Sequence, residues 1–265
     1  TLEETRTQRF IDISARGLLP VPVRYYAAHT GRWGGDDKIN LQNLPSRGPN
    51  GKKLKCSIVA PEGYSLIDCD SSQIEARVLA WLAGQDDLTN AFAKGDDVYK
   101  HMASSIYNVP SDGVSKDQRF VGKTTILGAG YGMGAVKFQL QLQGMGVYIE
   151  LDEARRIIDI YRSTNGAISQ LWREANNMVQ YMARGDSVQF GKEGVLQVDA
   201  RKNAIMLPSG LPMFYHGLAA EKSERGYEYT YRTRKGPNRI YGGKVVENVC
   251  QAVARCIIGH QMILL

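Results

Sequence analysis

Residues 115–132 read SKDQRFVGKTTILGAGYG and hold the pattern from which the fold is predicted. On a helix, residues four apart lie one above another on a single face. One face of this helix therefore carries Arg119, Lys123, Leu127 and Tyr131. At ~1.5 Å per residue the stripe is roughly 18 Å long, which suits a triphosphate at its cationic end and a stacked base at its aromatic end. An amphipathic helix that extends two cations over an apolar core is an equally good interpretation.

The same stretch carries signals for where the helix begins and how closely it is approached. Ser115 and Gln118 have the spacing of a capping box, which predicts the helix start. Gly122, Gly128 and Gly130 weaken a helix and leave its backbone bare. Their presence indicates that another group comes close to the helix.

A second informative stretch, residues 63–82, reads GYSLIDCDSSQIEARVLAWL. Leu66, Asp68 and Asp70 alternate, so they share one face of a short predicted strand. Ser72 and Glu75 have capping-box spacing and predict a helix directly after it. An acidic residue at a strand end before a helix is typical of a metal ligand. The alternative is that Asp70 forms a turn and Glu75 only caps the helix.

With both stretches in view, the chain resembles DNA polymerase family A, the DNA polymerase I family. Residues 70–77, DSSQIEAR, are similar to its motif A, and the Arg-Lys-Leu-Tyr stripe is similar to motif B, the finger helix that grips the incoming nucleotide. Thr30-Gly31-Arg32 and NLQNLP at 40–45 resemble a stretch that touches primer and template. ENVCQ at 247–251 resembles a palm helix whose Gln lies near the primer terminus. The sequence GGKVVEN at 242–248 resembles that of phage members of the family.

The resemblance implies nucleotidyl transfer, in which a primer 3′-hydroxyl attacks the α-phosphate of a deoxynucleoside triphosphate. Such chemistry depends on positioning and charge neutralisation, here by two Mg²⁺ ions. Asp70 is implied as the bridging carboxylate, the Ser71 carbonyl as a second ligand and Asp68 as a reserve. Lys123 would contact the α-phosphate and Arg119 the outer phosphates.

Further roles come from the resemblance as well. Glu75 would crowd the sugar 2′ position and exclude ribonucleotides, and Tyr131 would stack near the nascent base pair. The implied substrate-binding residues are Glu75, Leu127, Tyr131, Tyr99 and Gln73. The implied contacts with primer-template DNA, which do not read sequence, are Arg32, Gln42, Asn43, Arg77 and Gln251.

The chain departs from the family pattern in three places. Tyr99 stands where the family often has a His that contacts the triphosphate, and Leu127 stands where Phe or Tyr is usual. The sequence reaches Leu265 before any His-Asp-Glu motif C, and the thumb and exonuclease regions are not seen. We therefore expect residues 1–265 by themselves to be inactive.

Composition is consistent with a protein that binds nucleic acid. The net charge of +6 suits a polyanionic partner, and 43% hydrophobic residues are enough for a core. The four cysteines form no CxxC pair and indicate reduced thiols in the cytoplasm, that of a bacterial host if the protein is phage-encoded. No apolar run reaches ~18 residues and no signal peptide is visible, so no membrane association is expected. Other phage replication proteins are further expected partners.

The predicted fold class is α+β: an antiparallel polymerase palm sheet with a helical fingers insertion, truncated. The expected domains are a first palm part at 1–85, fingers at 86–195 and an incomplete palm return at 196–265. A helix is expected at 1–12, two strands at 54–70 around a turn at Pro61, short strands at 187–244 and a last helix from 246. Seven helices are expected between them, at 72–84, 88–93, 97–107, 116–131, 135–142, 152–161 and 165–183, with Asp152 and Asn165 as caps of the last two.

Three interpretations stay open on the sequence. Basic and tyrosine residues at 227–244 could track a nucleic-acid backbone or form a solvated hairpin edge. A single-subunit RNA polymerase of similar fold is one alternative function, although an acid at Glu75 would block a 2′-hydroxyl. A catalytically dead nucleic-acid-binding module is the other, and the intact Asp70, Lys123 and Arg119 argue against it.

Overall fold

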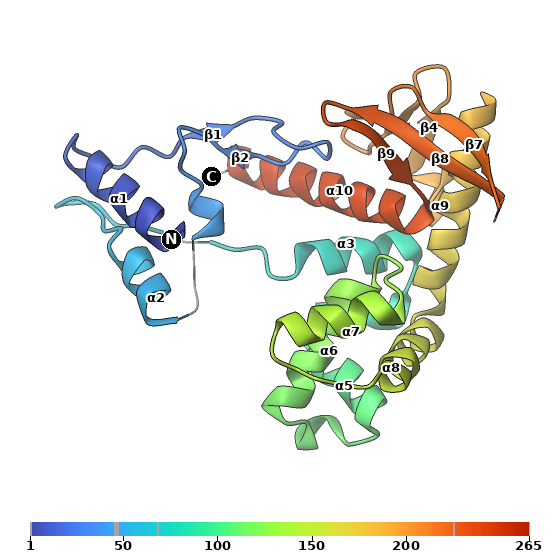
Figure 1. Ribbon diagram of the computed structural model, residues 1–265, viewed down its shortest axis with the longest axis horizontal. Coiled ribbons are helices and arrows are strands. Elements are labelled where there is room, and N and C mark those ends of the chain that lie inside the picture. The colour runs from blue at the N-terminus through green and yellow to red at the C-terminus, as the bar shows by residue number, and fades with distance from the viewer. Residues whose placement is uncertain (1, 45–47, 68, 225, 265) are drawn as a thin grey trace. The chain divides into compact units, whose positions relative to one another are not determined.

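The computed structural model describes residues 2–44, 48–67, 69–224 and 226–264 (Figure 1). The chain forms two compact units, residues Thr1–Ser72 and Gln73–Leu265. Helices and short antiparallel strands both occur, which agrees with the predicted α+β class.

The first unit is the smaller of the two. It contains α1 (Leu2–Ser14), the paired two-residue strands β1 (Val23–Arg24) and β2 (Gly34–Gly35), the 3-10 turn η1 (Leu41–Asn43) and α2 (Gly48–Cys56). Arg9 of α1 forms a 2.8 Å ion pair with Asp37, and Ile13 and Ile39 are buried. The helix predicted at 1–12 is confirmed as α1.

The strands predicted at 54–70 are wrong. Residues 54–56 belong to α2, and the described residues from 57 to 72 form neither helix nor strand. The turn at Pro61 is confirmed, since the Tyr64 N–H donates to the Pro61 carbonyl at 3.1 Å. A strand is stabilised by a hydrogen-bonded neighbour, and the ladders of the described residues pair nothing with this segment. Asp68 lies outside the described residues.

All seven helices predicted between 72 and 183 are confirmed, with ends shifted by at most three residues. They are α3 (Ile74–Ala83), α4 (Asp86–Lys94), α5 (Val98–Tyr107), α6 (Lys116–Ala129), α7 (Ala135–Gly144), α8 (Leu151–Thr164) and α9 (Gly166–Arg184), with the 3-10 turn η2 (Ser111–Gly113) between α5 and α6. The capping box of α6 is confirmed in both directions: Gln118 N–H donates to Ser115 Oγ at 3.2 Å and Ser115 N–H to Gln118 Oε1 at 2.9 Å.

Two of the predicted caps are wrong, and the third, Asn165, is confirmed in its position but not in its side-chain bond. Helix α3 begins after Gln73, whose left-handed backbone (φ 57°) separates Ser72 from the first turn. Glu150 precedes α8, so Asp152 lies inside its first turn and pairs with Arg155 at 2.7 Å. Asn165 precedes α9 as expected, but its side-chain amide donates to the Tyr161 carbonyl at 3.0 Å instead of capping.

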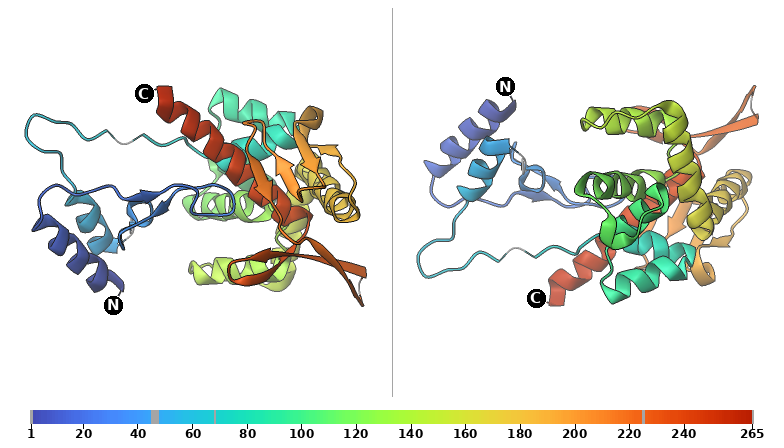
Figure 2. Two further views of the ribbon diagram at one scale, coloured as in Figure 1. Left: turned by 90° about the horizontal axis from the view of Figure 1, so that it is seen from above. Right: turned by 90° about the horizontal axis from the view of Figure 1, so that it is seen from below.

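Strands predicted at 187–244 are confirmed as two antiparallel sheets. The first has the order β3 (Gln189–Phe190), β4 (Leu196–Asp199), β5 (Ala204–Met206), β6 (Pro212–Phe214), with the 3-10 turn η3 (Lys192–Gly194) between β3 and β4. The second has the order β7 (Ala219–Ser223), β8 (Gly226–Thr233), β9 (Gly236–Ile240). The second sheet extends beyond the helices of its unit (Figure 2).

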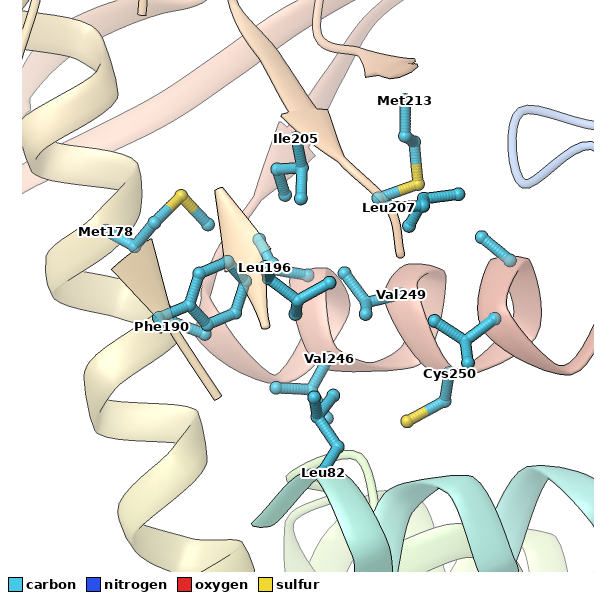
Figure 3. Close-up of a cluster of buried hydrophobic side chains, with 14 of the residues drawn as sticks. Leu82, Met178, Phe190, Leu196, Ile205, Leu207, Met213, Val246, Val249 and Cys250 are labelled. Atoms are coloured by element: carbon cyan, nitrogen blue, oxygen red, sulfur yellow. The ribbon is translucent and has the colours of Figure 1, made fainter. Parts of the chain in front are cut away.

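The last helix, α10 (Gly242–Leu264), starts four residues before its predicted position and forms the centre of the second unit. One side of it packs against α9 and the four-stranded sheet, and the other against α3 (Figure 1). In Figure 3, Leu82 of α3 faces Val246, and Cys250 points its sulfur toward α3. A second apolar cluster joins α3 to α8. None of the helices in the described ranges is long and apolar enough to cross a membrane.

Candidate active site

The cationic end of the α6 stripe lies beside the start of α5. A Cβ on Gly122 would collide with the Tyr99 carbonyl of α5, so glycine allows the two helices to come into close contact. Gly128 and Gly130 are approached by Met133 and Leu79 respectively. The close approach that these glycines indicated is therefore made by neighbouring parts of the same unit.

Asp97 joins the two helices through both of its carboxylate oxygens. Oδ1 caps α5 by accepting from the Tyr99 and Lys100 N–H groups, both at 3.2 Å, and Oδ2 accepts from Arg119 Nε at 2.6 Å. Burial acts to raise the pKa of Asp97, but the hydrogen bonds and the charge of Arg119 outweigh it, so the pKa lies below its usual range. Arg119 is thus held beside a fixed carboxylate while its side chain stays 39% exposed.

Tyr99 is buried, with 5% of its surface exposed, and its ring lies close to both cations of the stripe. The Arg119 guanidinium carbon is 5.3 Å from the ring centroid and Lys123 Nζ is 5.9 Å from it. Burial raises the pKa of Tyr99, so its hydroxyl stays protonated at neutral pH. The structure therefore brings Tyr99 to the two cations that the sequence had already placed on one helix face.

The other end of the stripe leads to α3. Leu127 is 45% exposed on α6. Tyr131 follows the end of the helix, and its hydroxyl donates to Glu75 Oε2 at 3.5 Å, a long hydrogen bond. Burial, with smaller contributions from Cys250 and Glu75, raises the pKa of Tyr131 well above its usual range. The two motifs meet at this pair.

Helix α10 also lies against Tyr131, at the aromatic end of the stripe. Gln251 Nε2 donates to Glu247 Oε1 at 3.4 Å, and Glu247 also accepts from Lys244 Nζ at 2.9 Å. The close approach of α10 depends on its first residues, because a Cβ on Gly243 would collide with the Tyr131 carbonyl and one on Gly242 with the Trp172 carbonyl. Trp172 in turn donates to the Gly130 carbonyl at 2.9 Å.

Arg77, the other predicted site residue of α3, contacts Phe92 of α4. Arg77 donates to the Phe92 carbonyl at 3.1 Å and stacks over the Phe92 ring at 4.8 Å. Gln73 is the residue with left-handed backbone directly before α3.

Five predicted residues belong to the first unit. Arg32 closes a turn in which its carbonyl accepts from the Ala27 N–H at 3.0 Å, and its side chain is exposed. Gln42 and Asn43 are exposed on η1, which Asn40 caps by accepting from the Gln42 N–H. Asp70 is exposed and Ser71 is half-buried at the end of this unit.

Comparison with known proteins settles the family. The sequence model described as DNA polymerase family A matches residues 14–193, which is more than half of the chain. The chain belongs to DNA polymerase family A. The match includes the residues of the α6 stripe, Glu75 and Asp70, but not α10.

Bacterial relatives match a little over half of this family A chain. It is 38% identical over 162 residues to DNA polymerase I of Pseudomonas aeruginosa, covering 60% of this chain and 17% of the relative. It is 38% identical over 145 residues to the thermostable DNA polymerase I of Thermus aquaticus, covering 55% and 17%. The chain thus spans 17% of the length of these curated relatives.

A solved family A structure has a similar fold. The POL domain of Pol1 from M. smegmatis, in complex with DNA primer-template and dNTP, matches with a TM-score of 0.52 and 23% identity. The match covers 88% of this chain and 33% of that one. At this identity the likeness shows the fold.

The metal chemistry of family A polymerases can be tested against the residues present. Within the described ranges, no group of three or more His, Cys, Asp or Glu side chains forms a ready-made metal site. Mg²⁺ binds through one or two carboxylates and completes its shell with water and substrate phosphates. The exposed Asp70 carboxylate and the neighbouring Ser71 carbonyl are hard oxygen donors that fit this preference.

Sequence reasoning did not identify the contacts that Asp97 and Glu247 make with predicted site residues, or the pairing of Lys244 with Glu247. Asp97 carried a signal, since Asp before Val98 is a typical helix cap, but its pairing with Arg119 spans 22 residues. Lys244 and Glu247 have the three-residue spacing at which opposite charges meet on a helix.

Proposed function

We propose that this chain is the nucleotide-binding part of a template-directed DNA polymerase, which adds deoxynucleoside triphosphates to a primer 3′ end. The observation that carries the proposal is the α6 stripe. Its Arg119 and Lys123 share one face above Tyr99, and its far end meets Glu75 through Tyr131. A nucleoside triphosphate likewise carries its negative charge at one end and its base at the other.

Each residue of the proposed nucleotide site has a role that follows from its position along or beside the stripe. The Arg119 guanidinium keeps terminal N–H groups for the outer phosphates, because Asp97 takes its Nε. Lys123, one turn further along, would contact the α-phosphate and deliver a proton to the leaving pyrophosphate. Glu75, with its carboxylate bonded to Tyr131, excludes a sugar 2′-hydroxyl.

The metal and DNA contacts are part of the same proposal. Asp70 and the Ser71 carbonyl would hold Mg²⁺, which supplies charge neutralisation at the phosphates and activation of the attacking hydroxyl when bound. Tyr99 and Gln73 contribute to the nucleotide site, and the exposed Leu127 borders the sugar. The residues proposed to contact primer-template DNA are Arg32, Gln42, Asn43, Arg77 and Gln251.

The wider assignment follows the family pattern. We assign residues 1–85 to the first part of a palm, 86–195 to the fingers and 196–265 to the returning palm of a right-hand fold. The wording GGKVVEN at 242–248 supports a role in phage replication, with other phage replication proteins as partners, in the cytoplasm of a bacterial host. The relatives compared above are bacterial, so the phage assignment rests on the GGKVVEN sequence alone.

A primer-extension gel with Mg²⁺ tests the function in the full-length protein that contains these residues. We expect extension with deoxynucleotides, little with ribonucleotides, and none in Asp70→Asn. Extension with ribonucleotides alone would indicate an RNA polymerase. DNA binding without extension in the unsubstituted protein would indicate a non-catalytic binding module.

Residues 1–265 by themselves are expected to give no extension in the same gel. Asp70 is the one dependable acidic ligand that the motifs supply within them, and each lost ligand to the transition state costs several kcal/mol, where about 1.4 kcal/mol is tenfold in rate. Added nucleotides that appear with 1–265 and vanish in Asp70→Ala would contradict this.

A further inference from the structure

The buried Tyr99 ring offers a role other than direct contact with substrate. We propose that Tyr99 is a positioning residue, whose ring holds Arg119 and Lys123 side by side so that both face the phosphates of one incoming nucleotide. This inference rests on the proposed function, since it assumes that the two cations bind a triphosphate. It assigns Tyr99 a task that differs from the triphosphate contact of the His often found there in the family.

Distances support a shared aromatic platform. Both cations lie within the ~6 Å at which an aromatic face attracts a positive charge: Arg119 at 5.3 Å and Lys123 at 5.9 Å from the ring centroid. Like charges four residues apart on a helix repel each other by a few tenths of a kcal/mol. The negative ring face and the Asp97 carboxylate beside Arg119 offset that repulsion.

The packing of α5 on α6 keeps the platform in place. Tyr99 meets α6 with its backbone as well as its ring, because its carbonyl occupies the space that a Gly122 side chain would need. Asp97 bonds the N–H of Tyr99 and the guanidinium of Arg119 at once. Ring, carbonyl and cap are therefore fixed relative to the two cations before a nucleotide arrives.

Burial separates this role from that of a phosphate ligand. With 5% of its surface exposed, the Tyr99 side chain has little area to offer a substrate, whereas Arg119 and Lys123 are only partly covered. The ring contributes by its face, so its hydroxyl is not needed for the proposed task. This predicts that an aromatic ring, and not the tyrosine hydroxyl, is the required chemical group.

The test compares Tyr99→Phe with Tyr99→Leu in the full-length protein. Single-turnover incorporation gives the dissociation constant of the deoxynucleotide and the maximal rate, and a separate titration gives primer-template affinity. We expect the nucleotide dissociation constant of the Leu variant to exceed that of the Phe variant about tenfold, the loss of two cation–π contacts, with primer-template affinity equal in both. Tyr99→Met, which fills more of the ring volume, repeats the comparison if the Leu variant does not fold.

Tyr107→Leu is the matched control, since Tyr107 is a half-buried aromatic residue at the other end of α5. It should leave the nucleotide dissociation constant unchanged. Phe and Leu (or Met) variants that both keep the wild-type constant would overturn the platform, and so would a Phe variant as weak as Leu, which would indicate a hydroxyl contact. A wild-type protein that neither incorporates nor binds deoxynucleotides would overturn the proposed function instead.

Discussion

Tyr131 donates a hydrogen bond to Glu75 at 3.5 Å, and this contact joins two sequence motifs that are 56 residues apart. Burial, with smaller contributions from Cys250 and Glu75, keeps the pKa of Tyr131 far above neutral, so the hydroxyl remains a donor at any physiological pH. Glu75 is thereby held at the aromatic end of the α6 stripe. Its position there leads to a first prediction about sugar choice.

Substitution Glu75→Ala should admit ribonucleotides. Removing the carboxylate opens the space that a 2′-hydroxyl would occupy, so the preference for deoxynucleotides should fall by at least tenfold in a competition assay. Glu75→Gln keeps the volume and should keep most of the discrimination. If Glu75→Ala discriminated as well as wild type, Glu75 would have only a structural role at the start of α3.

Substitutions Arg119→Ala and Lys123→Ala should reduce deoxynucleotide use by about 10²–10³-fold, because each removes a charge aimed at the phosphates. Primer-template affinity, measured by fluorescence anisotropy, should change little. Lys116→Ala, at the exposed start of the same helix, is the control for loss of a positive charge. A fall in DNA affinity with normal nucleotide kinetics would make α6 a DNA-binding element.

Leu127 should make the enzyme discriminate against dideoxynucleotides. Its exposed side chain offers no hydroxyl to replace the missing 3′-hydroxyl of such a substrate. We expect Leu127→Tyr to increase dideoxy incorporation and Leu127→Phe to increase it less, as read from chain termination on a gel. Efficient termination by the wild-type protein would contradict this role.

Asp97→Asn should destabilise the protein at neutral pH and lose that effect in acid. The pKa of Asp97 is lowered in the folded state, so its contribution is present above the unfolded pKa of about 3.9 and disappears as pH falls through the folded value. Asn still caps a helix, so the difference isolates the pairing with Arg119, worth about 0.2–1 kcal/mol for a pair this exposed. Urea unfolding at pH 7, 5 and 3 measures it. A difference that did not shrink with falling pH would exclude the charge pairing as its cause.

Gly243→Ala should lower stability by about 1–3 kcal/mol, because the added methyl group collides with the Tyr131 carbonyl and forces α10 to shift. Gly144→Ala, at a position with open space around it, is the control and should be neutral or mildly stabilising. Chemical denaturation of both variants gives the comparison. Equal stability would show that α10 tolerates displacement.

Local sequence was enough to predict the elements whose signals lie within a few residues. The capping box at Ser115 and Gln118 and the four-residue spacing of the stripe placed α6 correctly, because a helix is built from hydrogen bonds between near neighbours in the chain. The same reasoning failed for residues 54–70. Alternation of side chains along the segment favoured strands there, but a strand depends on hydrogen bonds to a partner elsewhere in the chain. The first residues of the segment belong instead to α2.

By itself, the sequence determined that α6 carries two cations, a leucine and an aromatic residue in line, and its motifs indicated the family. Tertiary structure alone decided what surrounds them: Asp97 on Arg119, the Tyr99 ring beneath both cations, and Glu75 bonded to Tyr131. These contacts join residues far apart in the chain, and they form only when α3, α5 and α6 bury their apolar faces together. Packing of that kind depends on the shapes of many side chains at once, which no local spacing encodes.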